Sequence, residues 1–160
     1  MDDAPIGYME RTRHYYRALG YANDYVWSTF ADVPFARLSK PLSQTRIALM
    51  TTASPPGLAN RDADGEWHVW SGDVTPPPEN LSTDFRAWDR ESTHTQDRES
   101  YLPIAAASAL ATDGVIGGVV ARFHCVPTQY SQRKTLEEHA PELLARIRED
   151  GADAALLCAL

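Results

Sequence analysis

The last ten residues, GADAALLCAL at 151–160, place the strongest constraint on how this chain can fold. Gly151 is the kind of residue that ends a helix, and the run behind it is apolar apart from Asp153. A continuous apolar run of this length is typical of a strand that is buried on both faces in a parallel sheet. The chain must therefore build a sheet around this strand.

The segments before this strand alternate between helix and strand patterns. YLPIAAASALATDG at 101–114 predicts an alanine-rich helix, and GGVVARFHC at 117–125 predicts a strand. SQRKTLEEHAPELLARIRED at 131–150 predicts an amphipathic helix, in which Pro141 should remove a backbone hydrogen bond or cause a kink. With RIALMTT at 46–52 as the first strand, this order predicts an α/β fold, a three-layer sandwich with a mainly parallel sheet and Rossmann-like topology.

The rest of the chain is less regular. Residues 8–19 have a helical pattern, GEWHVWSGD at 65–73 suits a hairpin arm, and DFRAW at 84–88 alternates like a strand. A length of 160 residues fits one hydrophobic core. We therefore expect an N-terminal helical and irregular extension over 1–32 and a single α/β domain over 33–160.

Composition excludes several classes of protein. The net charge is −7, with 15 basic residues scattered among 22 acidic ones, so we expect no nucleic-acid partner. No apolar run is long enough to cross a membrane, and the acidic N-terminus is not a secretory signal. Two cysteines cannot form a disulfide framework, which favours a reducing, cytoplasmic setting.

The two cysteines, Cys125 and Cys158, are the first candidates for a site. Each lies near the carboxyl end of a predicted strand, where ligands gather in open parallel sheets. A reactive thiol needs a lowered pKa, whereas most cysteines that form no disulfide are small buried hydrophobes, and both interpretations stay open. His124 and Cys125 are adjacent on a strand and point to opposite faces, so they cannot share a metal ion. We predict neither a metal site nor a cofactor.

His94 and Asp97, in the polar stretch THTQD, are the second pair of candidates. A histidine in a loop after a strand end can act as an acid, a base or a ligand holder, or it can be an ordinary loop residue. Asp97 either orients His94 or caps the helix expected over 101–112. The chain lacks the G-x-S-x-G sequence of serine hydrolases, so the sequence alone gives that class no support.

Five segments resemble the selenoprotein B subunits of the glycine, sarcosine, betaine and D-proline reductases and their selenium-free relatives. The segments are VPFARLSKPLSQTRIALMTTAS, DFRAW, HTQDRESYLPI, GVIGGVVARFHC and LEEHAPELLARIREDGADAALL, in the family's order and over most of the chain from residue 33. The resemblance implies an oxidoreductase that cleaves C–N bonds of an amino acid or amine with a thiol/disulfide couple. It also implies that His94 and Asp97 flank the substrate.

The same resemblance places the redox residue, selenocysteine or cysteine, directly after the strand that ends near Cys158. We therefore expect that residue immediately after Leu160 if the chain is the front part of a longer selenoprotein; the alternative is a short paralogue without the redox loop. Cys158 is then a substitute nucleophile and Cys125 a possible second thiol.

Two further interpretations do not require catalysis by this chain. The apolar C-terminal strand can pair with another chain, in a homo- or hetero-oligomer with other reductase subunits. A binding domain for a small amine, using tryptophan faces, is the other alternative.

Overall fold

The computed structural model describes residues 7–24, 26, 28–33, 36–84, 91, 95–128 and 131–160. The chain divides into two compact units, residues 1–35 and residues 36–160. The first unit carries helix α1 (Tyr8–Ala18), beyond which Arg17 Nε donates to Asp24 Oδ1 at 2.7 Å. Among the described residues no helix has both the length and the apolar character needed to cross a membrane.

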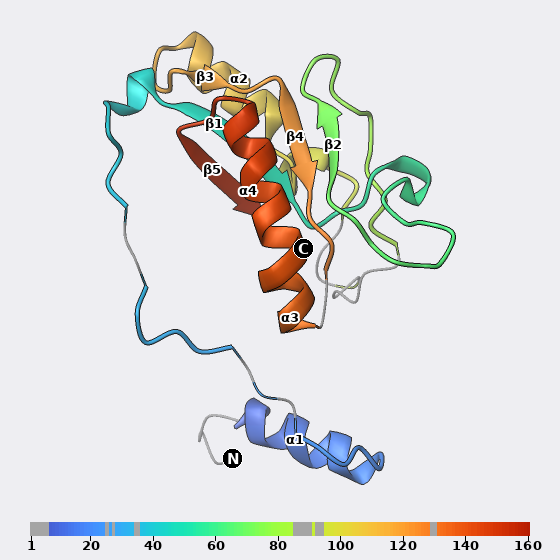
Figure 1. The fold of residues 1–160 in the computed structure, drawn as a ribbon. Coiled ribbons are helices and arrows are strands. Elements are labelled where there is room, and N and C mark those ends of the chain that lie inside the picture. Colours follow the sequence, from blue (N-terminus) through green and yellow to red (C-terminus); the bar gives the residue numbers. More distant parts are fainter. Residues whose placement is uncertain are drawn as a thin grey trace. The chain divides into compact units, whose positions relative to one another are not determined.

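The second unit is built on one sheet (Figure 1). Its strands are β1 (Arg46–Thr51), β2 (Trp70–Asp73), β3 (Gly118–Val119), β4 (Arg122–Cys125) and β5 (Ala154–Cys158). β1 pairs in parallel with β3, β4 and β5, whereas β2 pairs antiparallel with β4. The predicted α/β class is therefore confirmed, but the sheet is mixed, because the hairpin arm predicted over 65–73 joins it as an antiparallel strand.

The order of the strands fixes where a site can form. β5 pairs with Ile47–Thr51 along one edge of β1, so β3 and β4 must share the other edge. They form one interrupted strand, where the sequence predicted a continuous one over 117–125. The parallel strands thus lie in the order second, first, third along the chain. This is a doubly wound topology, whose switch point lies between the carboxyl ends of β1 and β5.

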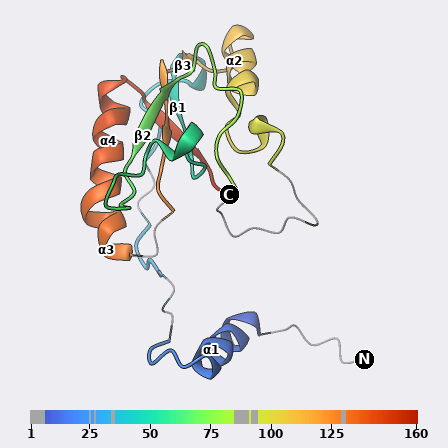
Figure 2. The same cartoon turned by 90° about the vertical axis from the view of Figure 1, so that its right-hand side faces the viewer.

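Helices cover both faces of the sheet. Figure 2 shows α2 (Ile104–Thr112) on one side and α4 (Ala140–Glu149) on the other, which confirms the three layers. The apolar core lies between the sheet and α2. Its buried members are Leu49, Ala53, Val74, Leu81, Tyr101, Leu102, Ile104, Ala107, Phe123 and Cys125.

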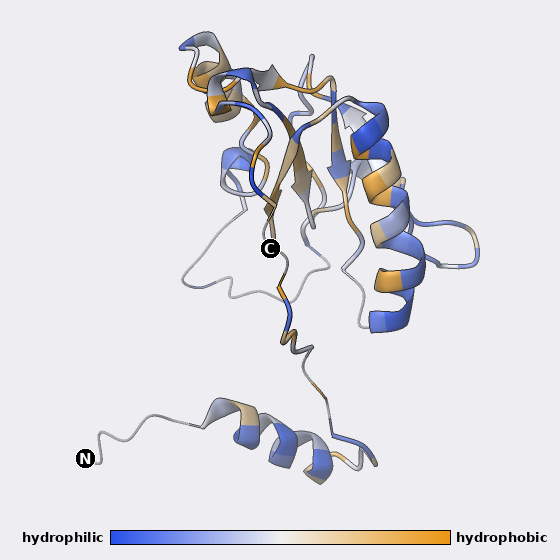
Figure 3. Ribbon diagram, turned by 60° about the vertical axis from the view of Figure 1, so that its left-hand side comes forward, coloured by the Kyte–Doolittle hydropathy of each residue, from blue (hydrophilic) through white to orange (hydrophobic). Residues whose placement is uncertain are grey.

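The α4 face of the sheet is more polar. The side chains of β4 alternate, so Phe123 and Cys125 enter the α2 core while His124 faces α4. Figure 3 shows apolar and polar residues along α4, and Leu144 on its predicted apolar face is 46% exposed. The predicted apolar face of α4 is therefore only partly buried. The packing of α4 on the sheet depends on ion pairs as well as on apolar contacts.

The helix predicted over 131–150 changes its hydrogen bonding before Pro141. It begins as α3 (Gln132–Lys134), continues as a π-helical turn, η4 (Thr135–His139), and ends as α4. Pro141 lies at the start of α4 and lacks the N–H that a regular helix would need. The expected disturbance thus takes the form of a π turn, a known way of accommodating such a site within a helix.

Short 3₁₀ turns complete the unit: η1 (Leu42–Gln44), η2 (Pro56–Leu58) and η3 (Arg98–Ser100). The helix predicted over 101–114 begins only at Ile104, after Pro103. Of the strand predicted over 84–88, residues 85–88 lie outside the described residues, and Asp84 is in a turn.

Candidate functional site

The carboxyl ends of β4, β1 and β5 carry a row of three residues. Thr51, the last residue of β1, pairs with Cys125 on one side and with Cys158 on the other. Residues paired in this way point to the same face of a sheet, so the Thr51 side chain lies between those of the two cysteines, and its hydroxyl accepts from the backbone N–H of Ala53 at 3.2 Å. Neighbouring strands are about 4.8 Å apart, which puts the two cysteines about 10 Å from each other. The sheet therefore brings both predicted cysteines to one edge, with Cys158 at the switch point and Cys125 on the other side of β1.

The environments of the two cysteines differ. Cys125 is fully buried in the α2 core, whereas Cys158 is half-buried. Burial raises the pKa of the Cys158 thiol, which opposes formation of the thiolate at neutral pH. The thiols are not joined, and Cα atoms more than about 7 Å apart cannot be bridged by a disulfide without backbone movement. The pair is thus not a direct disulfide couple.

Hydroxyl groups line the loops at the same end of the sheet. Ser54, just beyond β1, exchanges two backbone hydrogen bonds with Ser82, at 3.0 and 2.8 Å. The hydroxyls of Thr83 and Thr95 lie 2.7 Å apart, so they hold together the two ends of the segment between them. Thr83 and Thr95 therefore lie next to each other, and Thr83 follows Ser82 beside the carboxyl end of β1.

His94 itself lies outside the described residues, and Asp97 has a structural role. Asp97 Oδ1 accepts from the backbone N–H of Glu99 at 2.9 Å and caps η3. The expected cap of α2 is instead supplied by Glu99, whose Oε2 accepts from the N–H groups of Ala105 and Ala106 at 2.9 and 3.1 Å. The prediction that Asp97 could cap the helix over 101–112 is therefore wrong, because the residue that caps α2 is Glu99, two positions later.

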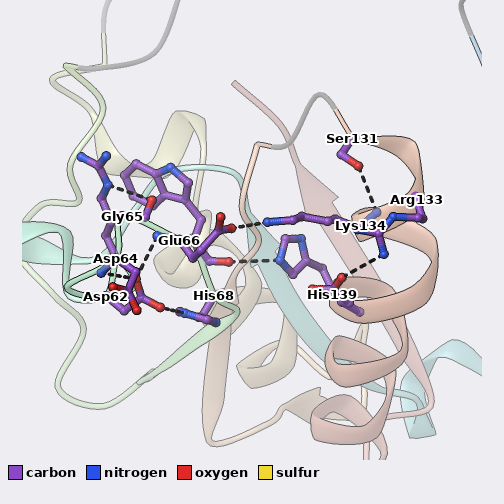
Figure 4. A network of polar contacts seen from close by, with 12 residues as sticks. Asp62, Asp64, Gly65, Glu66, His68, Ser131, Arg133, Lys134 and His139 are labelled. Atoms are coloured by element: carbon purple, nitrogen blue, oxygen red, sulfur yellow. Dashed lines mark hydrogen bonds and ion pairs between the residues drawn. The ribbon is translucent and has the colours of Figure 1, made fainter.

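A polar network ties the hairpin around Asp62–His68 to the start of the long helix (Figure 4). Lys134 forms an ion pair with Glu66, and His139 Nε2 donates to the backbone carbonyl of Trp67 at 3.0 Å. Within the hairpin, a hydrogen bond from His68 lowers the pKa of Asp62. These contacts fix the helix that follows β4 beside the carboxyl end of the sheet.

A second cluster of functional groups lies on the α4 face, where the sequence did not point. His124 Nδ1 is 2.9 Å from Ser71 Oγ on β2, and His124 Nε2 is 3.1 Å from Asp150 Oδ2 at the end of α4. The contact between His124 Nε2 and Asp150 Oδ2 does not have the geometry of a good hydrogen bond, so it is mainly electrostatic. Arg122 pairs with Asp150 at 2.6 Å, and Arg146 Nη1 donates to Ser71 Oγ at 2.9 Å. The one feature of the sequence that could have indicated this cluster is His124, a polar residue inside an apolar strand.

No cluster of three or more His, Cys, Asp or Glu residues in the described part of the chain can hold a metal ion. No family model, no curated protein and no solved structure matches this chain.

The reactivity of the cysteines can be measured directly. Because burial raises the pKa of Cys158, we expect it to react with iodoacetamide several-fold more slowly than glutathione at pH 7, and to accelerate as the pH rises. Cys125 should react only after unfolding, since it is fully buried. Peptide mass spectrometry measures both rates. A Cys158 that outpaces glutathione at pH 7 would restore its role as substitute nucleophile.

His124 should make the stability of the domain depend on pH. Burial lowers its pKa; Asp150 opposes this shift, while Arg122 and Arg146 add to it. Below the unfolded pKa of about 6.5 the unfolded chain takes up a proton that the folded chain does not. Stability is therefore complete above that pH and falls as the pH drops through the folded pKa, by at most about 1.4 kcal/mol per pH unit.

Urea unfolding between pH 7.5 and 5.5 tests this dependence. The variant His14→Gln is the matched control, because that histidine is exposed on α1 in the first unit and should leave the pH slope of the domain unchanged. The variant His124→Gln should flatten the slope. If the parent chain and both variants show the same slope, the pH dependence of stability comes from titratable groups other than His124.

Proposed function

We propose that residues 36–160 form a domain of a cytoplasmic reductase subunit that cleaves a C–N bond in an amino acid or amine derivative. The observation that carries the proposal is the row Cys125–Thr51–Cys158 at the carboxyl edge of a doubly wound sheet, with Cys158 at the switch point. Catalytic groups gather at this position in α/β proteins. The resemblance to the selenoprotein B subunits supplies the reaction class.

The reaction needs two electrons and one soft nucleophile. A selenolate or thiolate attacks the carbon that bears nitrogen, and the C–N electron pair leaves with the amine. A second thiolate then attacks the sulfur or selenium, so that the carbon takes a proton and a selenide-sulfide or disulfide forms. An external dithiol returns the two electrons. The cytoplasm suits this cycle because thiols stay reduced there.

The environment of Cys158 argues for a supporting role. Its thiol is too weakly acidic to be a good nucleophile near pH 7, and Cys125 is closed to solvent. The resemblance places the redox residue directly after β5, next to Cys158 and Thr51. In this scheme the described residues provide the scaffold, and the loop hydroxyls around Ser54 and Thr83 hold the carboxylate or amine of the substrate.

Ligand binding by the chain tests the proposal. We expect glycine, sarcosine, betaine or D-proline to bind saturably in calorimetry, and Thr83→Val to weaken binding about tenfold by removing one of the loop hydroxyls that hold the substrate in this scheme. The exposed Thr112→Val is the control. A variant with selenocysteine or cysteine added after Leu160 should release ammonia or the amine from glycine, sarcosine or betaine, or open the ring of D-proline, when a dithiol is supplied. Absence of both binding and release would refute the proposal.

The exposed surface of β5 favours a second candidate, a non-catalytic subunit that pairs through this strand. Leu156 and Leu157 point to opposite faces of the sheet and are 47% and 50% exposed. In the described residues β5 pairs only with β1, and no charge or proline protects its free edge. Such a strand has the composition of an interior strand, but the burial on both faces predicted for it from the sequence is not found among the described residues.

Sedimentation distinguishes this candidate from the first. If β5 pairs with a second copy, the chain should sediment as a dimer, and Leu157→Lys should convert it to a monomer. Leu136→Lys, at a helix position that is 62% exposed, should leave the dimer intact. A monomeric parent chain that binds no amine would remove both this candidate and the amine-binding alternative.

A further inference from the structure

The polar cluster on the α4 face has a defined direction of hydrogen bonding. Arg146 can only donate, so Ser71 Oγ accepts its N–H at 2.9 Å. The Ser71 hydroxyl proton is then free to point to His124 Nδ1, which lies 2.9 Å away. This leaves the His124 proton on Nε2, facing Asp150 at 3.1 Å. The order is that of a nucleophile, a base and an orienting carboxylate.

We propose that Ser71, His124 and Asp150 form a second reactive centre, which transfers acyl groups from small esters to water. The elements that build it are β2, β4 and the end of α4, which are distant in sequence. It lies on the opposite face of the sheet from the cysteine row and is independent of the reductase proposal.

The chemical step follows from these positions. Ser71 Oγ attacks the ester carbonyl and passes its proton to His124 Nδ1. The C–O bond of the ester breaks, and the alcohol leaves with that proton. Water then attacks the acyl-serine in the same way, which releases the carboxylic acid and restores the hydroxyl. Asp150 stabilises the imidazolium, and the Arg146 guanidinium beside Ser71 stabilises the negative charge on the carbonyl oxygen.

The burial of the groups matches these roles. His124 is fully buried and the Asp150 side chain is 8% exposed, so the base is shielded from bulk water. Ser71 is half-buried and lies on β2, the outermost strand at its end of the sheet. Arg146 and Glu142 beside it are 30% and 41% exposed, which leaves an approach from solvent. The off-line contact between His124 and Asp150 is common in ligand-free sites, where catalytic contacts tighten on binding.

A fluorophosphonate probe tests the proposal on the native chain. Phosphorus bonds to Ser71 Oγ and fluoride leaves, so the expected product is one adduct on the peptide that contains Ser71. Ser71→Ala should abolish the adduct, and Ser108→Ala, at an exposed serine on α2, should retain it. Because the base must be neutral, the labelling rate of the parent chain should fall about tenfold per pH unit below the pKa of His124.

The variant His124→Gln should lower the labelling rate at pH 7.5 about 100-fold. The pH profile of the unmodified chain gives the same information if that variant does not fold. An unlabelled parent chain, an adduct that persists in Ser71→Ala, or a rate independent of pH would each show that the cluster only stabilises the fold.

Discussion

The substitution Phe123→Ala is expected to destabilise the domain by about 4 kcal/mol. Phe123 is fully buried at the centre of the α2 core, and its ring centroid lies 5.9 Å from that of Trp70. Removing the ring loses its burial and leaves a cavity that the neighbouring strands cannot fill, because β4 is held on both sides by β1 and β2. Urea unfolding followed by tryptophan fluorescence measures the loss.

The matched control is Phe30→Ala, since Phe30 is 70% exposed and lies in the other unit. We expect a change within about 0.5 kcal/mol there. Equal effects of the two substitutions would mean that Phe123 is not at the centre of the core.

Gly117→Ala is expected to cost about 3 kcal/mol, as overpacking does at a site that cannot relax. A Cβ at this position would lie 2.7 Å from the backbone nitrogen of Thr45 and would overlap the carbonyl carbon of Gln44. Both neighbours are backbone atoms, and the Gly117 N–H already donates to the carbonyls of Leu42 and Thr45. The loop before β3 therefore has to move away from the start of β1.

Thermal unfolding tests this expectation, with Gly7→Ala as the control. A Cβ on Gly7 meets no atom within 4 Å, and Gly7 precedes α1 in the first unit. The melting temperature of the domain should drop markedly for the first variant and stay constant for the second. A stable Gly117→Ala protein would show that the junction between η1 and β3 is more open than the structure has it.

The elements that carry a local signal could be predicted from the sequence. The apolar run at 46–52, the alanine-rich stretch and the Gly151 cap led to β1, α2 and the turn into β5. They were predictable because periodicity and caps depend on residues within one or two turns of each other. The same local signals misplaced the start of α2, because Pro103 and the Glu99 cap move it to Ile104.

Part of the candidate site was also visible in the sequence. Cys125 and Cys158 are predictable candidates because each lies near the carboxyl end of a predicted strand, and parallel strands end at one edge of the sheet. The sequence could not give their register, in which Thr51 lies between them and keeps them from forming a direct disulfide. Register is set by pairing across the sheet, which leaves no mark at either cysteine.

The α/β class, the order of the main elements and the edge that carries the cysteines can all be predicted from local patterns in the sequence. By contrast, the antiparallel pairing of β2 and the meeting of Ser71, His124 and Asp150 on the α4 face arise only in the folded chain. The reason is physical. A helix or a strand is specified by its own side chains, whereas a contact between Ser71 and His124 exists only after β2 and β4 have paired and α4 has packed against them.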